Sequence, residues 1–176
     1  MKNTSKITLS AVMASLATAF MLLSYFPYLT YAIPAISGLF IMVIVIEVNK
    51  KWAVMAYITA SILVLLLAEP ESGLLFVSFF GYYPVLKASI DSMRKPVLEW
   101  AVKIAVFNIA VIAVYALFAK AFGISLEDFG TLGKYGAFIL LGMGNIVFIF
   151  YDVAVSRMAM VYMNMLHSKI SKFIKR

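Results

Sequence analysis

Two asparagines and two tyrosines stand out because their side chains are polar inside otherwise apolar stretches. Asn108 and Asn145 each fall near the middle of such a stretch. An amide buried among apolar helices normally hydrogen-bonds another amide or a ligand. Together with Tyr82 and Tyr115, they would give a pocket aromatic walls and a few orienting polar groups. All four are therefore candidate substrate-binding residues, and plain hydrogen bonding between helices is the alternative for each.

A second set of aromatic residues lies in the uncharged connection 25–34. Tyr28 and Tyr31 stand there with Pro27 and Pro34, and proline stops a helix from propagating. The connection either closes over a bound molecule as a lid or places its rings at the lipid headgroups, where tyrosine is enriched. Glu69, expected near the same face of the membrane, is the acidic candidate for the binding site.

The segment Gly81-Tyr82-Tyr83-Pro84 interrupts another apolar stretch. Proline removes one backbone hydrogen bond, and a freed carbonyl at membrane depth is tolerated only where protein or water satisfies it. We therefore expect a kink that faces the interior of the helix bundle.

Charged residues also occur within the apolar stretches, in the halves that we place nearest the cytoplasm. They are Lys87, Glu99, Lys103, Asp152 and Arg157. Charge in lipid demands a partner, so Asp152 is expected to pair with Arg157, Lys87 or Lys103. The pairing is either a static ion pair, a proton or ion relay, or a contact point for another subunit.

Other chemistry finds no residues to support it. The sequence has no cysteine and one histidine, His167, which stands beside lysines and is expected to be solvated. Paired histidines for zinc, a glycine-framed serine nucleophile and a phosphate-binding glycine loop are all missing. We expect no enzyme activity, metal or cofactor. The net charge of +7 is expected to reflect membrane topology rather than nucleic-acid binding.

The elements that must position these residues are transmembrane helices. Hydrophobic residues make up 64% of the 176 positions, and a helix needs roughly 20 apolar residues to cross a bilayer. Backbone groups in lipid must be satisfied internally, so the runs are expected to be helical. The fold class is all-α, with a single transmembrane domain over 1–176 as a compact bundle of six helices. The expected helices cover residues 5–25, 32–47, 52–68, 73–89, 97–122 and 134–166, and a basic tail covers 167–176.

Basic residues alternate between the two sides of the predicted spans. Lys2, Lys6, Lys50, Lys51, Arg94, Lys95, Lys169, Lys172, Lys175 and Arg176 flank one side. Loops that carry lysine and arginine face the cytoplasm, which places both termini of this multi-pass protein there. The connection 26–31, Glu69, Glu71 and the acidic stretch with Glu127 and Asp128 then face outward.

The first predicted helix carries small residues four positions apart. Ala11, Ser15 and Ala19 form one series, and Ala14 lies in another between Ser10 and Thr18. Small residues at this spacing let two backbones approach closely in lipid. The face packs either within the bundle or against another membrane subunit, for which Ala11, Ala14, Ser15 and Ala19 are the candidate docking residues.

On these features the chain resembles the substrate-binding S components of energy-coupling factor (ECF) transporters, which are prokaryotic. The resemblance rests on six predicted helices, the short basic leader, the first helix around Ala14 and the outward loop with Pro27 and Pro34. It implies capture of a vitamin or related micronutrient under a lid formed by that loop. It also implies docking of the first helix on a membrane coupling subunit driven by two ATPase subunits. The family pattern is alanine-x-x-x-alanine, whereas Ser15 stands here between Ala11 and Ala19.

Two other functions fit the same sequence. One is a stand-alone secondary carrier that uses the charges around Asp152, and the other is an envelope-assembly scaffold that binds no small molecule. If a ligand binds, the aromatic and weakly charged candidate residues favour a ring compound over a phosphate or a metal ion.

Overall fold

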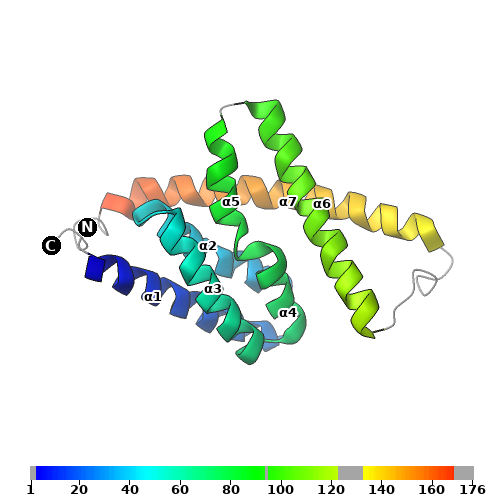
Figure 1. Cartoon of the computed structure of the whole chain (residues 1–176), viewed down its shortest axis with the longest axis horizontal. Helices are drawn as coiled ribbons and strands as arrows, with labels where there is room; N and C mark the ends of the chain where they lie inside the picture. Colours follow the sequence, from blue (N-terminus) through cyan, green and yellow to red (C-terminus); the bar gives the residue numbers. More distant parts are fainter. Residues whose placement is uncertain (1–2, 94, 123–132, 169–176) are drawn as a thin grey trace. The chain divides into compact units, whose positions relative to one another are not determined.

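A computed structural model of the chain describes residues 3–93, 95–122 and 133–168, and its regular elements are all helices within those ranges (Figure 1). Of the residues in these ranges, the side chains of 117–122, 133–135, 137 and 140 are not described. The elements are α1 (Asn3–Met21), the 3-10 turn η1 (Leu22–Tyr25), α2 (Ala32–Glu47), α3 (Lys50–Leu67), α4 (Pro70–Leu75), the π-helical η2 (Phe76–Phe80), α5 (Tyr83–Ile90), η3 (Asp91–Met93), α6 (Pro96–Phe122) and α7 (Gly133–Met165). The predicted all-α class is confirmed.

Five helical segments are long and apolar enough to cross a membrane. They are Asn3–Tyr25, Lys50–Leu67, Pro70–Met93, Pro96–Ala116 and Leu141–Met165. The chain is therefore a multi-pass membrane protein. The expected run 32–47 forms α2, whose 16 residues are apolar but short for a span. Six crossings and cytoplasmic termini remain predictions.

The described chain forms two compact units, and the boundary falls within α7. One unit contains α1 to α5 with the end of α7 from Ala154, and the other runs from Met93 to Val153. The expectation of a single transmembrane domain remains a prediction.

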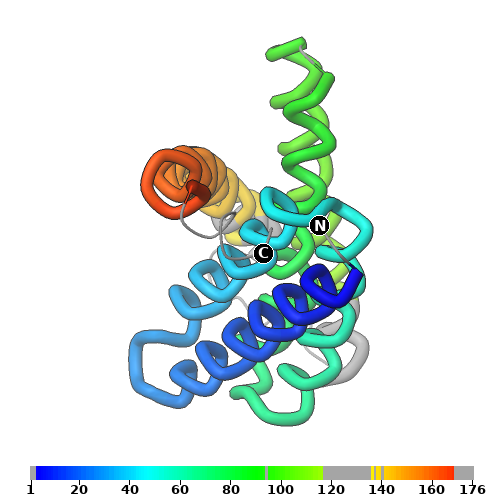
Figure 2. The backbone as a smooth tube through the Cα atoms, turned by 90° about the vertical axis from the view of Figure 1, so that its left-hand side faces the viewer, coloured from blue at the N-terminus to red at the C-terminus, as the bar shows by residue number. Residues whose placement is uncertain are grey.

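Small side chains on α1 and α3 contribute to the core of the first unit, which also contains larger residues such as Met21, Ile41 and Phe76. Helix α1 packs against both α2 and α3 (Figures 1 and 2). Its buried residues Ser10, Ala14 and Thr18 recur every four positions, and α3 buries Ala53, Ala56, Ala60 and Ser61. Side chains of this size allow the helix backbones to approach closely.

The second unit consists of α6 and the first part of α7. Its described contacts between the two helices are side-chain pairs concentrated between residues 103–108 on α6 and 145–152 on α7.

Some sequence-based predictions lie outside the described residues. These are the acidic outward stretch with Glu127 and Asp128, and the basic residues Lys2, Arg94, Lys169, Lys172, Lys175 and Arg176.

Candidate functional site

The span Pro70–Met93 contains a break near its middle. The Gly81 amide donates to the carbonyl of Phe76, five residues back, at 2.8 Å, which closes the π-helical segment η2. A turn follows at residues 81–82, and α5 begins at Tyr83 with Pro84 in its first turn. Gly81, Tyr83 and Pro84 are buried. The predicted interruption and its inward position are confirmed, and the expected helix 73–89 is three helical pieces.

A tyrosine from a neighbouring helix supports this break. The Tyr57 hydroxyl, from the middle of α3, donates to the Val77 carbonyl at 2.6 Å. In an α-helix that carbonyl would accept from the Gly81 amide, which is committed here to Phe76. A buried carbonyl without a partner is costly at membrane depth, so Tyr57 stabilises the interrupted geometry.

Aromatic rings surround the break. The ring of Tyr82 lies edge-on to that of Tyr57 with 6.0 Å between centroids, and 6.1 Å from that of Phe79. Phe79 in turn lies 4.8 Å from Tyr83, which is fully buried. Tyr82 is half-buried. The predicted candidate Tyr82 thus belongs to a cluster of rings that we call the break cluster: Tyr57, Phe76, Phe79, Tyr82 and Tyr83.

Sequence reasoning missed Tyr57. It is a tyrosine within an apolar run, and this criterion, which pointed to Tyr82, applies to it equally. Its role depends on a contact 20 residues away in the chain, which no local pattern reports.

The connection between α1 and α2 is fastened to the end of α3 and to the first turn of α4. The Tyr31 hydroxyl donates to Glu71 Oε1 at 2.7 Å, and Ser72 Oγ donates to the Thr30 carbonyl at 2.8 Å. The Tyr25 hydroxyl donates to the Leu67 carbonyl at 3.2 Å. The hydrogen bond to Glu71 raises the pKa of Tyr31, because it stabilises the protonated phenol beside a negative charge. Candidate Tyr31 is thus tied to Glu71, an acidic residue that the sequence analysis expected on the same outward side.

Candidate Glu69 caps α4. Its carboxylate accepts from the backbone amides of Glu71 at 3.2 Å and Ser72 at 2.8 Å. Partial burial acts to raise the pKa of Glu69, but the hydrogen bonds from Ser72 and Glu71 outweigh burial and lower the pKa. Glu69 therefore stabilises the start of the broken span and lies two residues before Glu71.

Candidate Tyr28 lies at the tip of the fastened connection. Its side chain is 98% exposed and its φ is 70°, in the left-handed region that tyrosine rarely adopts. Phe26 beside it is also exposed. These two rings are positioned to meet either lipid headgroups or a ligand at this end of the unit.

In the second unit, Asn108 and Asn145 bond to each other. Each side-chain amide donates to the carbonyl oxygen of the other, at 2.9 and 3.0 Å. Each also donates to the backbone carbonyl four residues earlier, Ile104 or Leu141, at 2.8 Å. Both hydrogens of each amide are used, so the structure shows the interhelical pairing that was the alternative to ligand binding. Candidate Tyr115 is half-buried on α6.

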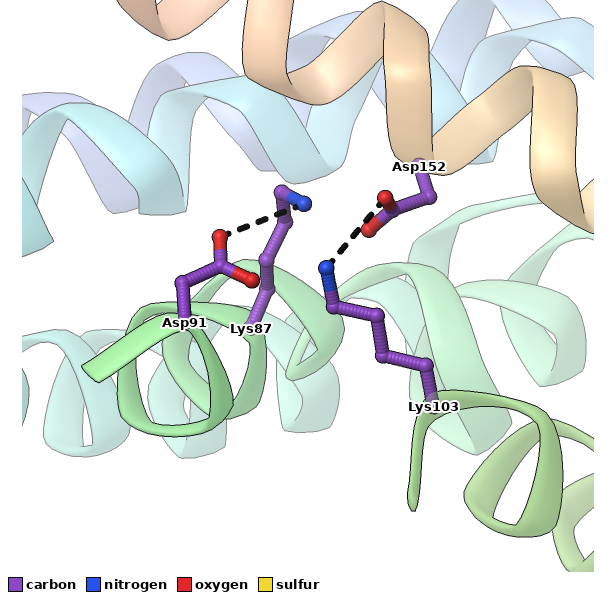
Figure 3. Close-up of polar contacts among 4 residues, drawn as sticks. All are labelled: Lys87, Asp91, Lys103 and Asp152. Carbon is purple, nitrogen blue, oxygen red and sulfur yellow. Dashed lines mark hydrogen bonds and ion pairs between the residues drawn. The ribbon is translucent and has the colours of Figure 1, made fainter. Parts of the chain in front are cut away.

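Beside the amide pair lies a buried ion pair. Lys103 Nζ lies 3.3 Å from Asp152 Oδ2, and both side chains are about 5% exposed or less (Figure 3). The ammonium also lies 5.3 Å from the ring centroid of Trp100, which adds a cation–π attraction. The predicted pairing of Asp152 with Lys103 is present in the structure.

The other buried lysine pairs along its own helix. In the first unit, Lys87 Nζ lies 3.3 Å from Asp91 Oδ2, one turn later, and the Lys87 side chain is 7% exposed (Figure 3). The Asp91 carboxylate is partly exposed, so this pair reaches the edge of the unit.

A further buried carboxylate was not predicted. Glu47, at the end of α2, accepts from the Tyr162 hydroxyl, and its Oε1 also lies 2.8 Å from His167 Nδ1. The Glu47 side chain is 3% exposed. His167, expected to be solvated, is instead partly buried in this contact. Glu47 was overlooked because it stands at the end of an apolar run, where a charge normally reaches water.

The candidate docking residues separate onto two faces of α1. Ala11, Ser15 and Ala19 are exposed, whereas Ala14 is 5% exposed and belongs to the core of the first unit. One small-residue series therefore serves internal packing, and the other remains on the outer surface of the described unit.

Comparison with known proteins adds no relative. No protein-family model, no curated protein and no solved structure matches the chain. The geometry of the site joins Tyr31 to Glu71 of α4, pairs Asn108 with Asn145 and places Tyr82 in the break cluster.

Proposed function

We propose that the chain is the substrate-capture subunit of an ECF-type importer in the cell membrane, with both termini in the cytoplasm. The proposed substrate is a vitamin-like ring compound of low charge. The proposed partners are a membrane coupling subunit and two ATPase subunits.

The break in the span Pro70–Met93 is the observation that carries the proposal. Irregular backbone at membrane depth is tolerated where protein or a cavity satisfies it, and interrupted helices line many transporter binding sites. Here the break is bounded by the aromatic rings of Tyr57 and Tyr82. The Tyr57 hydroxyl donates to Val77, and the Tyr82 hydroxyl adds hydrogen-bonding capacity. Rings with a few hydroxyls suit a flat, weakly charged molecule.

The chemistry of the two ends of the first unit supports the proposed orientation. One end carries the exposed aromatic residues of the connection 26–31 and the acidic residues Glu69 and Glu71. The other end carries Lys50 and Lys51 directly after the Glu47 contact. Basic residues mark the cytoplasmic side, so the aromatic connection would face outward and receive the substrate.

The outer face of α1 supports the proposed docking. Ala11, Ser15 and Ala19 present a surface of small side chains, flanked by exposed Val12 and Leu16. A facing helix could approach closely along this row. Ala14 has no part in it because it is buried within the unit.

Native mass spectrometry of the protein, purified from its own host at low copy, tests the proposal. We expect a stoichiometric small molecule together with an assembly that contains two ATPase subunits. Ser15→Leu should abolish the assembly and keep the bound molecule, and Leu16→Ile, on the same exposed surface, is the matched control. A ligand-free protein bound only to envelope proteins would refute the proposal in favour of a scaffold.

The buried pair of Lys103 and Asp152 favours a second candidate, a stand-alone carrier. Ionisable residues inside a membrane frequently serve ion pathways. A carrier would drive uptake in vesicles from a proton or ion gradient without other subunits, and Asp152→Asn would abolish that uptake. Uptake that requires ATP and partner subunits would exclude the carrier.

A further inference from the structure

Two groups, the Tyr57 hydroxyl and the Gly81 amide, are candidate hydrogen-bond donors to the Val77 carbonyl. The Tyr57 hydroxyl occupies it at 2.6 Å, while the Gly81 amide bonds the Phe76 carbonyl at 2.8 Å. Transfer of the Gly81 amide to Val77 would restore an α-helical hydrogen bond at the carbonyl that the tyrosine hydroxyl now occupies.

Gly81 makes this competition possible. A Cβ added at Gly81 would lie 2.8 Å from ring atoms of Tyr57 and 2.9 Å from the ring of Phe76. Any larger residue would therefore push the Tyr57 ring away from Val77. The absence of a side chain at residue 81 is what allows the hydroxyl of one helix to reach a backbone carbonyl of another.

The turn that follows can absorb a change of register. Residues 81 and 82 form a turn, and the amides of Val85 and Leu86 both bond the Tyr82 carbonyl. Pro84 has no amide hydrogen to return to Phe80. The hydrogen-bond ladder is already interrupted here, so a shift within η2 need not be transmitted rigidly into α5.

We infer that η2 is a two-register switch, in which the Tyr57 hydroxyl holds the π register and its withdrawal lets Gly81 bond Val77 in an α register. A shift of one residue along a helix corresponds to a rotation of about 100° and a translation of about 1.5 Å. The switch therefore changes how Tyr82, the next residue but one to Phe80, is presented. This inference concerns the helix itself and stands whether or not the chain captures a vitamin.

The Gly81 amide reports the register directly. The sequence has nine glycines, and Phe precedes glycine only at residues 81, 123 and 130. Labelling phenylalanine carbonyls with ¹³C and glycine amides with ¹⁵N selects these three sites, and Phe80→Leu identifies Gly81 by removing its labelled neighbour. In lipid nanodiscs we expect Tyr57→Phe to move the Gly81 resonance by more than its linewidth. The control Tyr28→Phe, at a fully exposed ring, should leave it in place.

Deletion of Ser78 provides a second, independent test of the two registers. A π segment is equivalent to one residue inserted into an α-helix. Deletion of Ser78 therefore places Gly81 four residues after Phe76, and the Tyr82 amide can then donate to the Val77 carbonyl. In the deleted chain, Tyr57→Phe should no longer change the Gly81 resonance or the midpoint of thermal unfolding. If the protein with Tyr57→Phe alone does not accumulate, the protein that combines Tyr57→Phe with deletion of Ser78 should accumulate normally.

Two results would overturn the inference. One is a Gly81 resonance that is identical in the native chain and in Tyr57→Phe. The other is a Tyr57→Phe variant that lowers the unfolding midpoint, or prevents accumulation, equally with and without Ser78.

Discussion

The core of the first unit and the α6–α7 contact of the second unit join helices in opposite ways. The first unit packs small residues of α1 and α3, such as Ala14 and Ala60, together with larger apolar residues of α2, such as Ile41. The second joins its helices through a buried ion pair, a reciprocal amide pair and the stacked rings of Phe107 and Phe148, whose centroids are 4.7 Å apart.

The difference teaches how each region responds to substitution. Helix association in lipid draws on close packing and on interhelical hydrogen bonds, because lipid is as apolar as the side chains. Packing of small residues spreads its free energy over many contacts, so it tolerates loss and resists added volume. Polar pairs concentrate free energy in a few atoms, so loss of one partner leaves the other buried and unsatisfied.

The largest effect is expected at Asp152. Asp152→Ala removes the carboxylate that pairs with the buried Lys103 ammonium, and removal of one partner of a buried pair costs about 3–5 kcal/mol. Thermal unfolding in detergent would measure the loss. The double variant Lys103→Met with Asp152→Leu should recover most of it. If Asp152→Ala unfolds at the native temperature, the pair contributes no stability to the α6–α7 contact.

A smaller effect is expected at Ala14. Ala14→Leu adds volume to a packed core, which costs about 1–3 kcal/mol. Ser15→Leu, at the adjacent exposed position, is the matched control and should leave the unfolding temperature unchanged. Equal effects of the two substitutions on the unfolding temperature would contradict the burial of Ala14 and the exposure of Ser15.

The amide pair should contribute less again. Interhelical hydrogen bonds in membrane proteins average about 0.6 kcal/mol and reach about 1.7. Asn108→Ala and Asn145→Ala should each destabilise within this range, and the double variant should cost less than both losses added together. Strict additivity in this cycle would mean that the two amides act independently.

The smallest effect is a pH dependence at the cap of α4. The pKa of Glu69 is lowered in the folded chain from the ordinary value of 4.5. The ionised carboxylate therefore makes its full contribution to stability above pH 4.5. This contribution is lost as pH falls through the folded pKa. Gln keeps one acceptor oxygen, so Glu69→Gln should lower stability at pH 7 by only part of the about 1 kcal/mol that a cap contributes, and it should flatten the fall in stability below about pH 4.5. An unchanged acid profile would contradict the role of Glu69 as a cap.

Sequence reasoning found the elements and part of the candidate site. Hydrophobicity and helical spacing predicted the apolar helices, and proline chemistry predicted the break at Gly81 to Pro84. The cost of an unpaired charge in lipid predicted that Asp152 would need a lysine or arginine. These predictions succeeded because each depends on a property of one segment or on a penalty that any fold must avoid.

The remaining features depend on contacts between distant segments. Spacing by four shows that α1 has small residues on two rows, but only packing decides that Ala14 is buried and Ser15 is exposed. The bond from Tyr57 to Val77 and the burial of Glu47 require knowing which helices are neighbours. The π register of η2 depends on the same neighbour.

The buried ion pair also affects when α6 can enter the membrane during synthesis. Lys103 and Asp152 are 49 residues apart, so at about 5–20 residues per second the ribosome supplies the carboxylate roughly 2–10 s after the ammonium. During that interval α6 carries a lysine whose insertion alone is unfavourable by about 2.5–3.5 kcal/mol. We therefore expect α6 to wait at the insertion machinery and to enter the bilayer together with α7.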